Sequence, residues 1–124
     1  MVTIVDVRAL ASVLPRSYEV SVRGRVKFRV GQYVYLAFSR DEQVLGFGFP
    51  REEREAALQT YPEKFIPPEP KDVRYAWMQV RLDAIERDEL HELVLDAWRM
   101  VVPKRLAATP DAELLRLMEE EPEG

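Results

Sequence analysis

The sequence contains no cysteine, a single histidine and no apolar run long enough to cross a bilayer. Without cysteine the chain can form neither disulfides nor thiolate metal sites, and a cysteine nucleophile is excluded. A membrane-spanning helix would need about 20 consecutive apolar residues. The N-terminal run carries Asp6 and has no Lys or Arg before it, which makes a poor signal peptide. We therefore expect a cytoplasmic protein.

Motifs that carry catalysis are also missing. The sequence has no phosphate-binding loop, dinucleotide fingerprint, nucleophile elbow or zinc-protease motif. No nucleophile accompanies His91, so a boundary histidine is the simpler interpretation than a base. Glu52, Glu53 and Glu55 suit the positive end of a helix, and the first two do not share a helix face. We expect a protein that is not an enzyme and that holds no metal and no cofactor.

Charge is distributed unevenly along the 124 residues. The formal net charge is −4, which taken alone disfavours a nucleic-acid partner. Residues 1–50 nevertheless carry seven basic and four acidic side chains, whereas residues 51–124 carry eleven and eighteen. The last fifteen residues hold six acids and one arginine. The balance of charge is therefore +3 over residues 1–50 and −7 over residues 51–124.

Hydrophobic periodicity predicts an α+β fold. Helical spacing covers residues 3–13, 50–61, 87–101 and 110–119, and alternation with a period of two covers residues 18–49 and 73–82. We expect an antiparallel sheet of about five strands with helices packed on one face. The predicted domain spans residues 1–109, and residues 110–124 add a short helix and an acidic tail.

Two details of this prediction concern particular residues. The proline-rich segment 65–72 is expected to be irregular, because proline cannot donate a ladder hydrogen bond. Trp77 and Trp98 are expected to anchor the core. The central core residues should be those that alternate along the third and fourth strands, namely Val34, Leu36, Phe38, Leu45, Phe47 and Phe49.

A row of cations stands out in the strand region. Arg23, Arg25, Lys27 and Arg29 occupy every second position, and no acid occurs between residues 20 and 40. In a strand such side chains lie about 6.6–6.8 Å apart on one face, a pitch that resembles successive phosphates of an extended nucleic acid. The alternative is an ordinary solvated face, or cations that protect an edge strand.

Neighbouring residues modify this interpretation. Arg40 adds a cation in the predicted turn 39–43, but two acids follow it directly. Tyr18, Tyr33 and Tyr35 flank the row and could stack on bases, as in single-strand binding proteins. Cross-strand packing is the more frequent role of such tyrosines.

Several loose motifs occur in a characteristic order. These are Leu14-Pro15 followed by Glu19, then Phe28-Arg29-Val30-Gly31 with Tyr33, then Phe65 and Pro67, Trp77, and the closing pair Ala97-Trp98. With this order and spacing, residues 10–106 resemble the MmcQ/YjbR family. The resemblance implies a CyaY-like α+β fold and a DNA-binding "double wing" of β-hairpins, here at residues 20–31 and 36–46.

The sequence departs from the family pattern at two places. Gln32 follows Gly31 where the family usually has Lys, and Arg74-Tyr75-Ala76 replaces a glycine-rich turn before Trp77. Frataxin shares the implied fold, but its iron binding needs carboxylates along the first helix, which here offers only Asp6. We expect no iron site.

The functional prediction combines the cation row with the resemblance. We expect low-specificity DNA or other nucleic-acid binding through Arg23, Arg25, Lys27, Arg29 and Arg40. The alternative is a protein-interaction or self-associating module, for example a homodimer, with no nucleic-acid role. A small-ligand or enzyme role ranks third, because it would require a concave pocket with convergent polar groups, which a sequence does not display.

Overall fold

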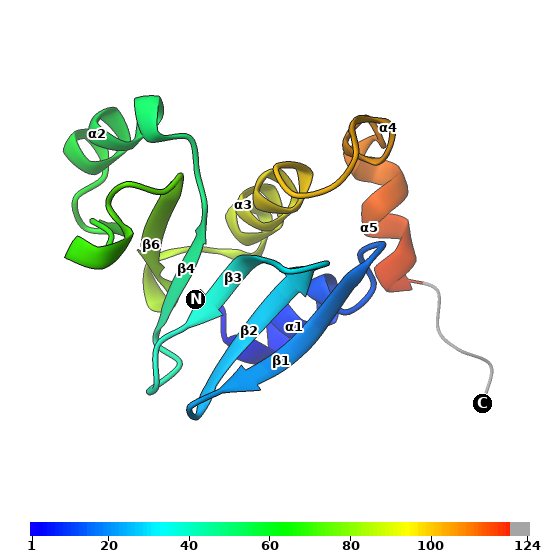
Figure 1. Ribbon diagram of the computed structural model, residues 1–124, viewed down its shortest axis with the longest axis horizontal. Helices are drawn as coiled ribbons and strands as arrows, with labels where there is room; N and C mark the ends of the chain where they lie inside the picture. Colours follow the sequence, from blue (N-terminus) through cyan, green and yellow to red (C-terminus); the bar gives the residue numbers. More distant parts are fainter. Residues whose placement is uncertain (120–124) are drawn as a thin grey trace.

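The computed structural model describes residues 1–119, which form an α+β fold with a single antiparallel sheet (Figure 1). The elements in chain order are α1 (Ile4–Ala11), β1 (Ser17–Val22), β2 (Arg25–Val30), β3 (Tyr33–Phe38), β4 (Val44–Gly48), α2 (Arg51–Thr60), β5 (Phe65–Ile66), η1 (Pro70–Asp72), β6 (Trp77–Arg81), η2 (Leu82–Ala84), α3 (Arg87–Arg99), α4 (Lys104–Ala107) and α5 (Asp111–Glu119). The predicted class is confirmed, with six strands instead of about five. The end of the predicted acidic tail, residues 120–124, lies outside the described residues.

The strands follow the order β1-β2-β3-β4-β6-β5, and every neighbouring pair is antiparallel. A two-residue turn joins β1 to β2, with Arg23 at φ 52° and Gly24 at φ 79°. In the turn from β3 to β4, the carboxylate of Asp41 accepts hydrogen bonds from the Ser39 hydroxyl (2.7 Å) and the Gln43 amide (3.0 Å). Because successive strands alternate in direction, both turns lie at the same end of the sheet (Figure 1).

The proline-rich segment is more regular than predicted. Phe65 and Ile66 form the edge strand β5 against β6, and residues 70–72 form the short helix η1. The strand ends before the first proline of the segment, and an edge strand needs ladder hydrogen bonds on one side only. The following strand is shorter than the predicted 73–82, because Arg54 of α2 binds the carbonyls of Val73 (2.8 Å) and Tyr75 (3.1 Å).

A β-bulge changes which residues of β3 face the core. Phe28 pairs with Leu36 but the next residue, Arg29, pairs with Val34, so Tyr35 is an extra residue in β3. Tyr35 is wholly buried, whereas Val34 is only half-buried. The core prediction is confirmed for Leu36, Phe38, Leu45 and Phe47. It is wrong for Val34, because of the bulge, and for Phe49, which follows the end of β4 and is half-buried.

The helices form the other layer of the core. The side chain of Thr3 caps α1 by accepting a hydrogen bond from the Val5 amide (3.2 Å), as the sequence predicts. Helix α3 packs against α1, β3 and β4, and its Trp98 donates a hydrogen bond to the Pro15 carbonyl (2.9 Å). Helix α5 contacts α1 and buries Leu114. Within residues 1–119, no helix combines the length and apolar content that crossing a membrane requires.

Candidate nucleic-acid interface and adjoining cavity

The strand register places Arg25, Lys27 and Arg29 on one face of β2, opposite to the face that buries Phe28 and Val30. The predicted row is therefore confirmed for three of its four cations. Arg23 is not part of the strand: it occupies the β1–β2 turn, where it is exposed at the hairpin tip.

The face that carries these cations continues across the sheet. Lys27 pairs with Val20 on one side and Ala37 on the other, and Ala37 in turn pairs with Gly46, which pairs with Gln79. Directly opposite residues in antiparallel strands point to the same face. The exposed Arg40 lies in the β3–β4 turn, at the same end of the sheet as Arg23. We call the five cations Arg23, Arg25, Lys27, Arg29 and Arg40 the basic face.

Lys27 and Arg29 are both half-buried, and Arg29 differs from the other members of the basic face in the burial of its Nε atom. It is half-buried between Tyr18 and Val34, and its Nε atom is buried without a hydrogen-bond partner among the described residues. The Tyr18 hydroxyl donates to the Gly31 carbonyl at the far end of the hairpin. Arg29 therefore uses its stem for packing, as long charged side chains often do.

The three tyrosines have different environments. Tyr33 is 60% exposed and Tyr18 is 43% exposed. Tyr35 is wholly buried, and its hydroxyl lies 2.6 Å from the Ser17 Oγ. For Tyr35 the packing interpretation is confirmed, and only Tyr18 and Tyr33 remain accessible to a ligand.

Neutralising contacts to the basic face are absent among residues 1–119. None of its five cations forms an ion pair there, whereas Arg8 pairs with Glu19 at 3.0 Å and Arg99 pairs with Asp111 at 2.6 Å. Acidic side chains do lie nearby: Glu69 and Asp72 line the same cavity as two of the cations.

Replacing Arg23 with Asn should remove one cation without weakening the hairpin. A turn with two positive φ angles favours Asn-Gly, and arginine in this conformation is strained. We expect Arg23→Asn to raise the free energy of unfolding by about 0.5–1 kcal/mol. Urea denaturation measures this change. Arg23→Val should instead lower the free energy of unfolding, because valine is β-branched. A loss of stability in the asparagine variant would contradict the turn assignment.

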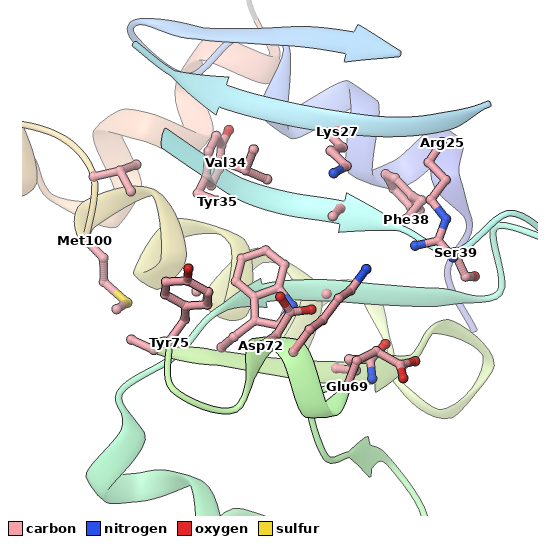
Figure 2. A pocket seen from close by; sticks show the side chains of 18 residues that line it. Arg25, Lys27, Val34, Tyr35, Phe38, Ser39, Glu69, Asp72, Tyr75 and Met100 are labelled. Atoms are coloured by element: carbon pink, nitrogen blue, oxygen red, sulfur yellow. The ribbon is translucent and has the colours of Figure 1, made fainter. Parts of the chain in front are cut away.

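A cavity of about 460 Å³ opens beside the basic face, between β2 and β3 on one side and β4, β6 and the segment 69–76 on the other (Figure 2). Its lining includes Arg25, Lys27, Ala37, Ser39, Gly46, Gly48, Glu69, Lys71, Asp72, Tyr75, Trp77, Gln79 and Met100. Sequence reasoning missed this cavity. The one available signal was the small residues Gly46 and Gly48, which alternate with the large core residues of β4.

Trp77 belongs to this cavity and not to the core. It is half-buried, so the prediction that it anchors the core is wrong, whereas Trp98 is wholly buried as predicted. The indole lies against Gly46, where an added Cβ would stand only 2.8 Å from the ring. Glycine at this position lets the ring approach the strand backbone closely.

Two observations concern the remaining titratable residues of the described chain. No group of three or more Asp, Glu or His side chains within the described chain could hold a metal ion. Burial lowers the pKa of His91, and the charge of Arg87 acts in the same direction. Its ring is therefore neutral at pH 7, as suits a half-buried boundary position.

Comparison with known proteins defines the class. The family model described as YjbR matches residues 12–100, so the chain belongs to the YjbR family. The chain is also similar to the crystal structure of Deinococcus radiodurans protein DR2400, described with a DUF419 domain. The TM-score is 0.72 at 24% identity, over 93% of this chain and 87% of that one, which shows a shared fold. No curated protein matches the sequence.

Proposed function

We propose that this protein binds nucleic acid with low sequence specificity through the basic face. The observation that carries the proposal is the charge of this surface: five cations from two hairpins, none of them ion-paired within residues 1–119. The sequence resemblance described above implies the same class of ligand. The short spacing along β2 suits contact with successive phosphates.

The geometry favours phosphate contact over base reading. Arg25, Lys27 and Arg29 follow one strand, and Arg23 and Arg40 extend the surface at the hairpin tips. Arginine pairs with phosphate oxygens in bidentate geometry, and such contacts position a protein without specifying sequence. Since the Nε atom of Arg29 is buried, three or four phosphates are the expected footprint.

Charge reversal at the centre of the basic face tests the proposal. Contact with three or four phosphates predicts a slope of log K against log salt of about −3 to −4 on duplex DNA. Arg25→Glu/Lys27→Glu should weaken binding and move the slope toward zero by about two. Fluorescence anisotropy with a labelled duplex measures both quantities across a salt series.

The matched control changes the net charge by the same amount, but outside the basic face. Lys104→Glu/Arg105→Glu alters two exposed cations of α4, which belongs to the helical layer. This variant should keep the wild-type slope. Equal losses in both double variants would show a nonspecific effect of net charge, and absence of wild-type binding at low salt would refute the proposal.

Self-association is the alternative if DNA does not bind. The specific observation is β1, an edge strand of six residues whose outer backbone side has no strand partner among the described residues. Such an edge can pair with a second copy. Light scattering would then show a concentration-dependent dimer.

A further inference from the structure

The cavity beside the basic face combines three kinds of surface. Figure 2 shows Arg25 and Lys27 reaching into it from β2, with Glu69, Asp72 and Tyr75 on the opposite wall. The indole of Trp77 also lines the cavity and lies against Gly46 of the sheet. A ligand in this cavity therefore meets only cations on the β2 side, two carboxylates together with Lys71 on the other side, and the flat ring of Trp77.

The volume restricts the size of the ligand. Sites for small molecules and cofactors are typically about 300–1,000 Å³, and this cavity measures about 460 Å³. A duplex cannot enter such a space. A single nucleotide that projects from a strand can enter, because only a base and part of its sugar must be accommodated.

The unequal charge of the two walls favours one orientation of a nucleotide, with its phosphate on the β2 side. Phosphate is attracted to Arg25 and Lys27, where no acid lines the wall, whereas beside Lys71 the carboxylates of Glu69 and Asp72 repel it. Carboxylates accept hydrogen bonds from the exocyclic amino groups of bases or from sugar hydroxyls. Gln79 donates its amide to the Pro67 carbonyl (2.8 Å), which leaves its side-chain oxygen as another acceptor on this wall.

The aromatic ring supplies the stacking surface. Bases stack on aromatic side chains without regard to sequence, because every base has a flat face. Trp77 is half-buried, so part of its indole is open to the cavity while Gly46 supports the other part. Tyr75, which is 52% exposed, stands at the same wall and adds a second ring.

Two cations belong to both the cavity and the basic face, which connects the two sites. A strand whose phosphates follow β2 brings its next base to the cavity mouth at Arg25 and Lys27. We propose that this cavity binds one unpaired nucleotide, with its base on Trp77 and its phosphate on Arg25 and Lys27. This inference rests on the proposed function. It adds that the protein prefers single-stranded or extrahelical nucleotides over paired ones.

The test compares three labelled DNAs of equal length: a fully paired duplex, the same duplex with one unpaired adenine, and a duplex with an abasic residue at that place. Wild type should bind the unpaired adenine about tenfold more tightly than the other two. Ala37→Ile adds bulk to the cavity lining but keeps all five cations, so it should abolish this preference and retain duplex affinity. Trp77→Leu should do the same by removing the stacking surface.

Ser21→Ile is the matched control for added bulk. Ser21 is exposed on β1 and pairs with Val26, on the face opposite to the cavity. This variant should keep the tenfold preference. Circular dichroism verifies that each variant is folded, and having two independent cavity variants keeps the test decisive if one of them fails to fold.

Free deoxyadenosine monophosphate separates the two possible sources of the ligand. If it binds wild type as tightly as the unpaired adenine does, and Ala37→Ile blocks it, the cavity serves free nucleotides. Equal wild-type affinity for paired and unpaired DNA would overturn the cavity inference while leaving the proposed function intact. Absence of binding to every DNA and to the free nucleotide would overturn both.

Discussion

Replacing Trp98 with alanine is expected to lower the free energy of unfolding by about 3–5 kcal/mol. The side chain is wholly buried in α3, and its removal leaves a large cavity beneath the sheet. The variant also leaves the Pro15 carbonyl without its indole donor. Domains of this size are typically stable by about 5–15 kcal/mol, so the variant should be close to unfolding. Urea denaturation followed by far-ultraviolet circular dichroism measures the loss.

Two further variants separate the contributions to this effect. Trp98→Phe keeps much of the volume and removes the donor, so it should cost less than the alanine variant. Trp77→Ala truncates the other tryptophan, which is half-buried at the cavity, and should cost less than about 2 kcal/mol because less of it leaves water on folding. Equal losses for Trp77→Ala and Trp98→Ala would contradict the placement of these two residues.

The two tryptophans show what periodicity can and cannot predict. The helical stripe of residues 87–101 identifies the buried side of α3, and therefore the place of Trp98. The strand around Trp77 is partly apolar on both faces, so alternation alone does not decide which face is covered by helices. Which face is covered depends on the tertiary fold: α3 packs against β3 and β4 on one face, and the segment 69–76 lines the cavity at the other.

The bulge in β3 is a second limit of local reasoning. Alternation predicts that every second residue of a strand lies on the same face. One inserted residue moves all positions before it to the opposite face from the predicted one. Tyr35 and Val34 consequently exchange the environments that alternation predicts for them. The cations of β2 were predicted correctly because they lie within one uninterrupted strand.

The basic face could be predicted from the sequence much better than the cavity. Three cations share a face because of their spacing in one strand, which is a local property of the sequence. The cavity is built from β2, β3, β4, β6, the segment 69–76 and the end of α3, and only the tertiary fold brings these together. Arg54 helps to form it by binding the carbonyls of Val73, Tyr75 and Trp77, a role that no motif indicates.

The buried tyrosine of β3 should make stability fall at alkaline pH. Burial raises the pKa of Tyr35 to about 12, and the hydrogen bond with Ser17 offsets only part of this effect. In the unfolded chain the hydroxyl ionises near pH 10, so the folded state holds its proton more tightly. The contribution of Tyr35 is therefore complete below about pH 10 and is lost as the pH rises toward 12, by roughly 2–3 kcal/mol in total.

Tyr35→Phe isolates this contribution from those of the other ionisable groups. The variant loses the hydrogen bond to Ser17, so at pH 7 it should be less stable than wild type by about 1 kcal/mol. Above pH 10 it has no hydroxyl to ionise on unfolding, so the difference should shrink and then reverse before pH 12. Urea denaturation at intervals from pH 7 to pH 12 traces the difference. Tyr33→Phe, at the exposed start of the same strand, should keep a constant difference from wild type. A constant difference for Tyr35→Phe as well would mean that Tyr35 ionises equally in both states, against its buried position beside Ser17.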